Sequence, residues 1–420
     1  MAIDGVRSMS GSFPVLSLAE CDRRWAALRA GMTTNAFDCL VIFGLKGREH
    51  YEGYVANENI EGFAILPRDS DPVLVSWHPK MVIRRRSPKL DPSRFWIKDA
   101  RIGNYGSILV EVLKERGLDR AGVGVIGLEI GEAGSPEGIV PFTTWRKALD
   151  GLPHARFSDA TWWFREVMLV KSAEELSVLR HCGMLGERAC QTMIDVVKPG
   201  ATEFEVFRAI QEQIHAGGAV MHDPFLIMTW GAQDIGWAEP AWAYYGGPPR
   251  VVEPGDLIMA ELFPAYGGLE TQQQMAVAVA PVAPIVAELG EVAARCYDAG
   301  IAALRPGRTF SDVWSAMVEP LKEIDGWSLT PMIHSVAPLG WVGGMGFNLD
   351  HMPAQLKSFR QAMQVEFGTR DLVLREGMSF AFEPNACKGQ HRVNVGGTVV
   401  VTSGEPEELN TAPNRLHVVG

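Results

Sequence analysis

Pro199-Gly-Ala-Thr-Glu-Phe-Glu-Val-Phe207 occurs again, in altered form, as Pro306-Gly-Arg-Thr-Phe-Ser-Asp-Val-Trp314. In both copies the Pro-Gly pair is typical of the end of one helix, and the Thr is a favoured N-cap of the next. An acidic residue follows each Thr three positions later, as in a capping box. The repetition predicts two related halves in this part of the chain, although Pro-Gly-x-Thr is also common between unrelated helices.

Apolar segments with strand character lie between and after these helices. They are Asp256–Phe263, Met275–Val282, Met378–Pro384 and Gly397–Thr402. Helices that back a mostly antiparallel sheet predict an α+β domain.

The N-terminal part of the chain has a different pattern, in which helices alternate with short apolar runs. The predicted helices are Leu18–Arg29 and Ser107–Arg116, and the predicted strands are Cys39–Phe43, Gly62–Leu66, Pro72–Ser76 and Val123–Ile126. This pattern indicates a smaller α/β domain. We place the boundary between Phe157 and Val170, which gives domains of residues 1–162 and 163–420.

The composition excludes several classes of protein. The 420 residues are 47% hydrophobic and 21% charged, as expected of a folded chain with two domains. A formal net charge of −11 argues against nucleic acid as a partner. The sequence contains neither a signal-peptide core in residues 1–17 nor an apolar run long enough to cross a membrane. We therefore expect a cytoplasmic protein with no membrane partner.

The six cysteines are scattered through the chain without any Cys-x-x-Cys pair. This spacing predicts neither a zinc knuckle nor a disulfide framework. We expect reduced, buried side chains rather than nucleophiles.

Several segments, taken in their order, resemble the creatinase/aminopeptidase P family. They are Lys171-Ser-Ala-Glu-Glu-Leu176, the two Pro-Gly-x-Thr segments, Glu253-Pro-Gly-Asp-Leu-Ile-Met259, Glu376-Gly-Met378, Phe382-Glu-Pro384 and Gly397-Thr-Val-Val-Val-Thr402. The resemblance implies the pita-bread fold, an α+β domain with two pseudo-symmetric halves, behind the smaller α/β domain. It also implies a homodimer in which Asn57, Glu58 and Asn59 of one subunit reach the site of the other.

Members of this family that cut peptides hold two metal ions with two Asp, one His and two Glu. The matching positions in this chain are Glu261, Gln272, Trp341, Glu383 and Gly396. Two carboxylates are too few to hold a pair of divalent ions against water. We therefore expect no metal ion and no other cofactor, as in creatinase, the family member that resembles this chain in having lost the metals.

The remaining groups predict acid–base catalysis by side chains, which needs a proton acceptor and a proton donor. Glu383, in the Phe-Glu-Pro segment, and Glu261 are the predicted catalytic carboxylates. His334 and His351 fall in segments similar to those that line the family's site, and either would carry the proton. The alternatives are a structural role for Glu383, a salt bridge between Glu261 and Arg392, and histidines satisfied within loops.

Aromatic and polar residues near these positions predict a pocket for a small molecule that is aromatic or cationic. The predicted substrate-binding residues are Trp230, Trp237, Tyr266, Gln272, Gln274, Trp341, His222 and Arg392. For the aromatic residues, ordinary packing in the core or in a dimer is the alternative.

The sequence as a whole favours a metal-independent, creatinase-like hydrolase of a C–N or amide-like bond in a small organic molecule. One alternative is a metal-dependent, Xaa-Pro dipeptidase-like enzyme or a lyase with an atypical site, including a site with one ion held by Glu261, Glu383 and a histidine. Another alternative is a non-catalytic pita-bread protein that binds peptides or partners.

Overall fold

The computed structural model describes residues 13–44, 50–128, 138–221, 227–231, 233, 235–236, 240–328, 331–338, 346–360 and 371–420. The chain divides into two units. The N-terminal unit consists of Val15–Glu174 and Pro338–Gly340, and the C-terminal unit consists of Met1–Pro14, Glu175–Ala337 and Trp341–Gly420. Among the described helices, none combines the length and the apolar character that a membrane span requires.

The N-terminal unit is built around one mixed sheet. Its elements are α2 (Leu18–Thr34), β1 (Cys39–Phe43), α3 (Tyr51–Ala56), β2 (Gly62–Pro67), β3 (Val73–Ser76), α4 (Pro79–Arg84), η1 (Pro92–Arg94), β4 (Asp99–Ile102), α5 (Tyr105–Glu115), β5 (Gly122–Ile126), α6 (Phe142–Gly151), β6 (Arg156–Asp159) and α7 (Thr161–Leu169). The strand order is β4-β3-β2-β1-β5-β6, with β1 antiparallel to β2 and parallel to β5. The predicted α/β character of this part is confirmed.

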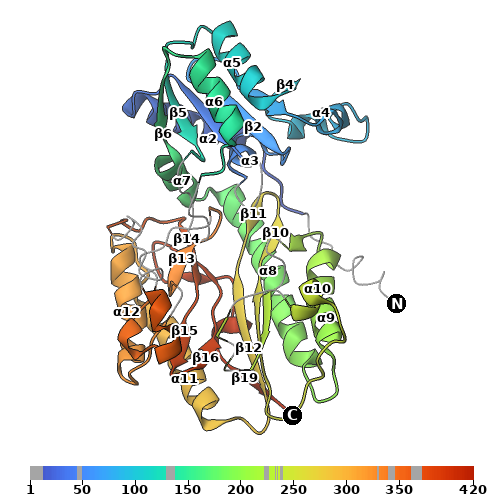
Figure 1. Ribbon diagram of the computed structural model, residues 1–420, viewed down its shortest axis with the longest axis vertical. Helices are drawn as coiled ribbons and strands as arrows, with labels where there is room; N and C mark the ends of the chain where they lie inside the picture. Colours follow the sequence, from blue (N-terminus) through green and yellow to red (C-terminus); the bar gives the residue numbers. More distant parts are fainter. Residues whose placement is uncertain are drawn as a thin grey trace. The chain divides into compact units, whose positions relative to one another are not determined.

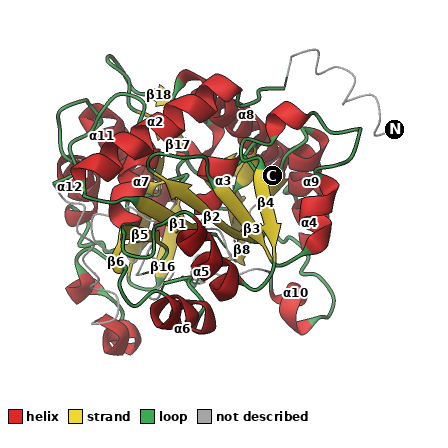
Figure 2. Ribbon diagram, turned by 90° about the horizontal axis from the view of Figure 1, so that it is seen from above, coloured by secondary structure: helices red, strands yellow, loops and turns green. Residues whose placement is uncertain are grey.

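Helices cover both faces of this sheet, which explains why β1 is apolar at every position. Leu40 and Ile42 pack with α2, α3 and α7, whereas Val41 and Phe43 pack with α5 and α6 on the other face. Figure 2 shows α5 and α6 together on one side of the strands. A strand buried on both faces reads as a continuous hydrophobic run, so its bounds were predictable.

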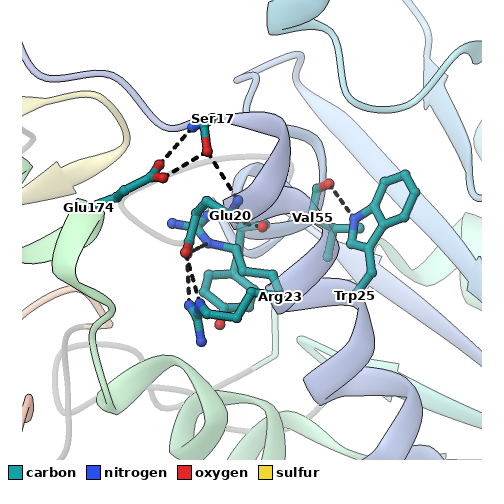
Figure 3. A network of polar contacts seen from close by, with 8 residues as sticks. Ser17, Glu20, Arg23, Trp25, Val55 and Glu174 are labelled. Atoms are coloured by element: carbon teal, nitrogen blue, oxygen red, sulfur yellow. Dashed lines mark hydrogen bonds and ion pairs between the residues drawn. The ribbon is translucent and has the colours of Figure 1, made fainter.

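A polar network fastens α2 to its neighbours (Figure 3). The Ser17 side chain caps α2 by accepting from the Glu20 amide, and its hydroxyl donates to Glu174 over 2.7 Å. Arg24 donates to Glu20 over 2.7 Å and to the Tyr54 carbonyl over 3.0 Å. Burial alone raises the pKa of Glu20, but hydrogen bonds from Arg23 and Arg24 hold that pKa below its ordinary value.

The C-terminal unit contains several small sheets and four long helices among its described residues. Its elements are α8 (Ala173–Val196), α9 (Glu203–Ala216), β7 (Val220–Met221), β8 (Ile227–Trp230), α10 (Ala241–Tyr245), β9 (Leu257–Leu262), β10 (Pro264–Tyr266), β11 (Leu269–Glu270), β12 (Gln273–Val279), α11 (Pro284–Ala303), α12 (Phe310–Lys322), β13 (Ile333–Ser335), η2 (Leu349–His351), η3 (Ala354–Phe359), β14 (Ser379–Phe382), β15 (Asn385–Lys388), β16 (His391–Asn394), β17 (Thr398–Val400), β18 (Glu407–Glu408), η4 (Ala412–Asn414) and β19 (His417–Val419). The strand orders are β11-β10-β7, β19-β12-β9-β8, β13-β14-β17-β18 and β15-β16. Most of these strands pair antiparallel, while β12 and β19 are parallel. The predicted α+β class is confirmed.

The same local structure occurs twice in this unit. Thr202 and Thr309 each form a capping box, with Glu205 and Asp312 respectively, at the start of α9 and α12. The glycine two residues before each Thr donates its amide over 2.9 Å, from Gly200 to Val252 and from Gly307 to Leu374. The predicted N-caps are confirmed. We call the part from α8 to β12 the first half of this unit and the part from α11 to β18 the second half.

In the first half, one face of the sheet packs on helices and the other carries Glu261 and Gln274. Ile258, Ala260 and Leu262 of β9 pack with α8 and α9 in a continuous apolar core. Figure 1 shows these two green helices beside the yellow strands. Because side chains alternate along a strand, Glu261 lies on the opposite face, level with Gln274 of β12.

The second half repeats this division. Phe380 packs on Phe310 of α12 with ring centres 5.7 Å apart, and Phe382 packs on Tyr297 of α11 at 5.5 Å. Alternation therefore directs Glu383 away from these helices. His334 of β13 pairs with Ala381 and shares the face of Glu383.

All six cysteines are buried and unpaired, as predicted. Burial raises the pKa of Cys182 and of Cys387 to about 12. These two thiols are therefore poor nucleophiles at neutral pH.

Candidate active site

Gln272 joins the two predicted catalytic carboxylates. Its Nε2 atom donates to Oε1 of Glu261 over 2.5 Å and to Oε2 of Glu383 over 3.3 Å. All three residues are at most 2% exposed. An amide carries two N–H groups and no charge, so it can hold two carboxylates close together while it reduces their mutual repulsion.

His334 extends this arrangement at the Glu383 oxygen that also accepts from Gln272. Its Nε2 atom lies 3.1 Å from Oε2 of Glu383, and its Nδ1 atom lies 2.9 Å from the carbonyl oxygen of Ser335. A carbonyl only accepts hydrogen bonds, so Nδ1 carries a proton. The contact with Glu383 then requires a further proton, which either the carboxyl group or the imidazole provides.

Two asparagines belong to the same group of side chains but were not among the predicted site residues. Asn385 donates to Oε1 of Glu383 over 3.3 Å, and Asn394 donates to Oε1 of Gln274. Both are nearly fully buried. Asn394 follows Arg392 by two positions, so the period of a strand was a signal that could have identified it. We call Glu261, Gln272, Gln274, His334, Glu383, Asn385 and Asn394 the polar cluster.

Several buried atoms of the polar cluster have no protein partner among the described residues. They are Oε1 of Gln272, Nε2 of Gln274, Oδ1 of Asn385 and Oδ1 of Asn394. Buried polar groups are normally hydrogen-bonded, so a set of unsatisfied acceptors and donors marks a place where water or a ligand binds.

Arg392 adds a buried positive charge beside this group. It is 6% exposed, its Nη2 atom lies 3.5 Å from Oγ1 of Thr229, and its Nε atom has no hydrogen-bond partner within the described structure. The predicted role of Arg392 in substrate binding is compatible with this position.

Two predicted substrate-binding aromatics, Trp230 of β8 and Tyr266 of β10, pack against the helix-covered core of the first half. Trp230 pairs with Ile258, packs against the core formed with α8 and α9, and donates to Asp256 over 3.1 Å. Tyr266 packs on His181 of α8 with ring centres 4.6 Å apart. Their predicted role in substrate binding stays a prediction, and proximity in the sequence does not reveal on which side of a strand a side chain lies.

The structure distinguishes the two predicted proton carriers. His334 contacts Glu383, whereas His351 is exposed at the end of η2, and no side-chain contact within the described residues joins it to either carboxylate. His222, Trp237 and Trp341 lie outside the described residues.

The donor set of the polar cluster does not fit a pair of metal ions. Between Glu261 and Glu383 stands the amide nitrogen of Gln272, which is a donor and not a metal ligand. At Gly396, where the resemblance places a second Glu, φ is 141° and an added Cβ would lie 1.9 Å from the Phe382 carbonyl oxygen. No group of three or more His, Cys, Asp or Glu within the described part of the chain is arranged to hold an ion.

Comparison with known proteins identifies the family. The model that describes metallopeptidase family M24 matches residues 177–403, which is more than half of the chain. The chain belongs to metallopeptidase family M24. The matched M24 region contains the whole polar cluster.

Two curated relatives of this M24 chain carry dipeptidase names. The Xaa-Pro dipeptidase of Lactobacillus helveticus is 24% identical over 233 residues, which is 55% of this chain and 57% of that protein. The probable dipeptidase PepE of Mycobacterium bovis is 26% identical over 262 residues, 62% of this chain and 63% of that protein. The chain thus spans about three fifths of the length of these relatives.

Solved structures agree with the M24 fold over nearly the full chain. The X-Pro aminopeptidase of Thermotoga maritima aligns with a TM-score of 0.71 at 15% identity, covering 94% of this chain and 99% of that one. Dipeptidase PepE of Mycobacterium ulcerans aligns with a TM-score of 0.71 at 20% identity, covering 96% and 99%. These matches confirm the predicted family and the pita-bread fold. For the activity, the names of the M24 relatives favour the dipeptidase-like alternative over the creatinase-like main hypothesis.

Proposed function

We propose that this M24 protein hydrolyses a C–N bond in a small dipeptide-like or amide substrate, and that the polar cluster performs the proton transfers without a pair of metal ions. The dipeptide class of substrate is supported by the named relatives. The mechanism is supported by one observation, the contact of the neutral Gln272 amide with both Glu261 and Glu383.

The proton shared by Glu383 and His334 supplies the acid–base chemistry. In this scheme one member of the pair accepts a proton from water as the water oxygen bonds to the substrate carbonyl carbon. The C–N bond then breaks, and the same pair returns a proton to the leaving nitrogen. The reaction consumes one water and needs no other reactant. General acid–base catalysis of this kind contributes about 10²- to 10⁴-fold to a rate.

The unsatisfied atoms of the polar cluster supply hydrogen bonds to the substrate. Nε2 of Gln274 is a donor for a carbonyl oxygen, and Oδ1 of Asn394 is an acceptor for an N–H group. Arg392 offers a buried guanidinium group for a substrate carboxylate. A dipeptide carries all three of these groups.

The proposal is tested with purified protein that has been dialysed against a chelator and checked by elemental analysis. A panel of Xaa-Pro dipeptides and small amides is assayed by mass spectrometry in ¹⁸O-labelled water. We expect turnover of at least one compound, with the label in the new carboxyl group, and a loss of at least about 100-fold in Glu383→Gln.

Glu203→Gln is the matched control, because Glu203 is a buried carboxylate on α9 that accepts a hydrogen bond from the Arg250 amide over 3.3 Å. It should retain full activity. Turnover that disappears on chelation and returns with Mn²⁺ would reject metal independence. An unsaturated product without the label would indicate a lyase, and no turnover of any compound would reject these substrate classes.

A further inference from the structure

A cavity of about 290 Å³ lies within the N-terminal unit. The guanidinium-bearing residues Arg84, Arg85 and Arg94 line it, together with Glu58 and the apolar side chain of Phe95. Its size is near the lower end of the range for small-molecule sites, about 300–1,000 Å³.

The surrounding segment is strongly basic in a chain that is acidic overall. Residues 79–98 contain Lys80, Arg84, Arg85, Arg86, Lys89, Arg94 and Lys98 but only one acidic residue, Asp91, whereas the whole chain has a net charge of −11. Positive charge gathered around a concave surface attracts anions and raises their local concentration.

Part of this charge is already neutralised within the N-terminal unit. Arg85 forms an ion pair of 3.2 Å with Glu58, donates to the Ile97 carbonyl, and lies 5.0 Å above the ring of Phe95. Asp91 accepts the Ser93 amide over 2.9 Å as the cap of η1. These contacts fix the wall of the cavity.

Arg84 and Arg94 are different. Both are exposed, and no described carboxylate lies within ion-pair distance of either side chain. Each unpaired guanidinium group can donate two N–H bonds to an anionic oxygen group, and the apolar wall offers a surface for the rest of the molecule.

We infer that this cavity binds a small organic anion, with its carboxylate or phosphate held by Arg84 and Arg94 and its apolar part against Phe95 and Met81. The site is a second ligand site, formed by residues of the N-terminal unit. Its ligand chemistry is defined by an anionic oxygen group joined to an apolar body of about one aromatic ring.

The test uses the full-length protein and ligand-observed ¹⁹F NMR. The probes are 4-fluorobenzoate and 4-fluorophenyl phosphate, with 4-fluorobenzyl alcohol as the neutral analogue. We expect the anions to bind and the alcohol not to bind. The Arg84→Gln/Arg94→Gln double variant should weaken anion binding by about 10-fold or more, since each removed group is a charge-assisted donor.

Arg86→Gln is the matched control, because Arg86 lies just beyond α4 and does not line the cavity. It should bind both anions as the wild type does. The melting temperature of the double variant should be unchanged, since both arginines are exposed. Turnover by the polar cluster should also be unchanged, so failure here is distinct from failure of the proposed function.

Three outcomes would overturn the inference. The first is no binding of either anion, and the second is equal binding by the wild type and the double variant. The third is binding of duplex DNA or of phosphatidylserine vesicles through the same arginines, with no competition by the small anions. That result would identify a macromolecular surface rather than a ligand cavity.

Discussion

Nε2 of His334 lies 3.1 Å from Oε2 of Glu383, while the other ring nitrogen of His334 donates to the Ser335 carbonyl. The geometry fixes the orientation of the imidazole and requires a proton between the two side chains. The two side chains come from neighbouring parts of one sheet, because His334 lies in β13 and Glu383 directly follows β14.

The His334→Asn variant is expected to lower kcat by about 10²- to 10⁴-fold, because it removes one partner of the proton-sharing pair. His351→Asn should retain wild-type kcat, because His351 is exposed at the end of η2. Steady-state kinetics on the substrate found by the panel provides the measurement. Equal losses in both variants would contradict the assignment of His334.

Gln272→Asp places a third carboxylate between Glu261 and Glu383, and we expect it to lower the free energy of unfolding by about 2 kcal/mol or more at pH 8. Mn²⁺ should recover part of this loss in the variant and have little effect on the wild type. Gln272→Asn has the same size without the charge and should respond to neither pH nor Mn²⁺. Chemical denaturation at pH 8 and at pH 5 tests both points, and an identical stability of Asp and Asn variants would show that the charges do not interact.

Gly396→Ala is expected to destabilise the protein by about 3 kcal/mol or more, since its Cβ would lie 1.9 Å from a backbone oxygen at a positive φ. Gly200→Ala is the control, because Gly200 also has a positive φ but no atom within 4 Å of the added Cβ. That variant should lose only about 1–2 kcal/mol. Similar losses in both would mean that backbone conformation, and not the close approach to Phe382, governs the effect.

Glu58 should make the stability of the N-terminal unit depend on pH. Burial raises the pKa of this carboxyl from 4.5 to about 7, although Arg85 and Arg84 oppose the shift. The folded protein therefore binds the proton more tightly than the unfolded chain does. This tighter binding contributes to the stability of the folded protein. The contribution is present in full below pH 4.5 and is lost as the pH rises through about 7.

Relative to Glu58→Gln, the free energy of unfolding of the wild type should accordingly decrease by about 2–3 kcal/mol between pH 4.5 and pH 8. Urea denaturation of both proteins across this range gives the difference directly. A constant difference would show that Glu58 titrates near its ordinary value.

The two capping boxes should contribute similarly to stability. Thr202→Ala and Thr309→Ala each remove a side-chain acceptor at a helix start and should cost about 1 kcal/mol. The free energy of unfolding of the double variant should decrease by the sum of the two single losses, because the effects of substitutions at separate sites are additive. Denaturant midpoints measure this, and a loss confined to one variant would argue against equivalent helix starts.

The longer strands were predictable because strands that are buried on both faces are continuous runs of apolar residues in the sequence. Cys39–Phe43 is apolar at every position, since helices cover both faces of its sheet, and its predicted bounds agree with β1. Short strands such as β7 and β11 have only two residues and arise from pairing with β10. No local pattern of two residues can indicate such pairing.

The candidate site was predictable only where a motif fixed the position. Glu383 and Glu261 were identified from family segments, and the alternation of β14 and β9 then directs both away from the helices that pack on these strands. Trp230 shows the limit, because it lies next to Thr229 in the sequence but on the other side of the sheet. A shift of one residue along a strand reverses the direction of a side chain.

Glu261 stands on a strand of the first half, and Glu383 follows a strand of the second. The distance between these two carboxylates consequently depends on how the two halves pack against each other. Gln272 connects the halves through its side chain, which donates to both carboxylates, and through its backbone amide, which donates to Thr398 over 2.9 Å. Substitutions in α8 or α11 that shift one half by a fraction of an ångström would change the distance between Glu261 and Glu383, although the substituted residues contact neither of them. Residues of the helices that cover the two halves are thus positions at which substitutions can alter substrate selectivity during evolution.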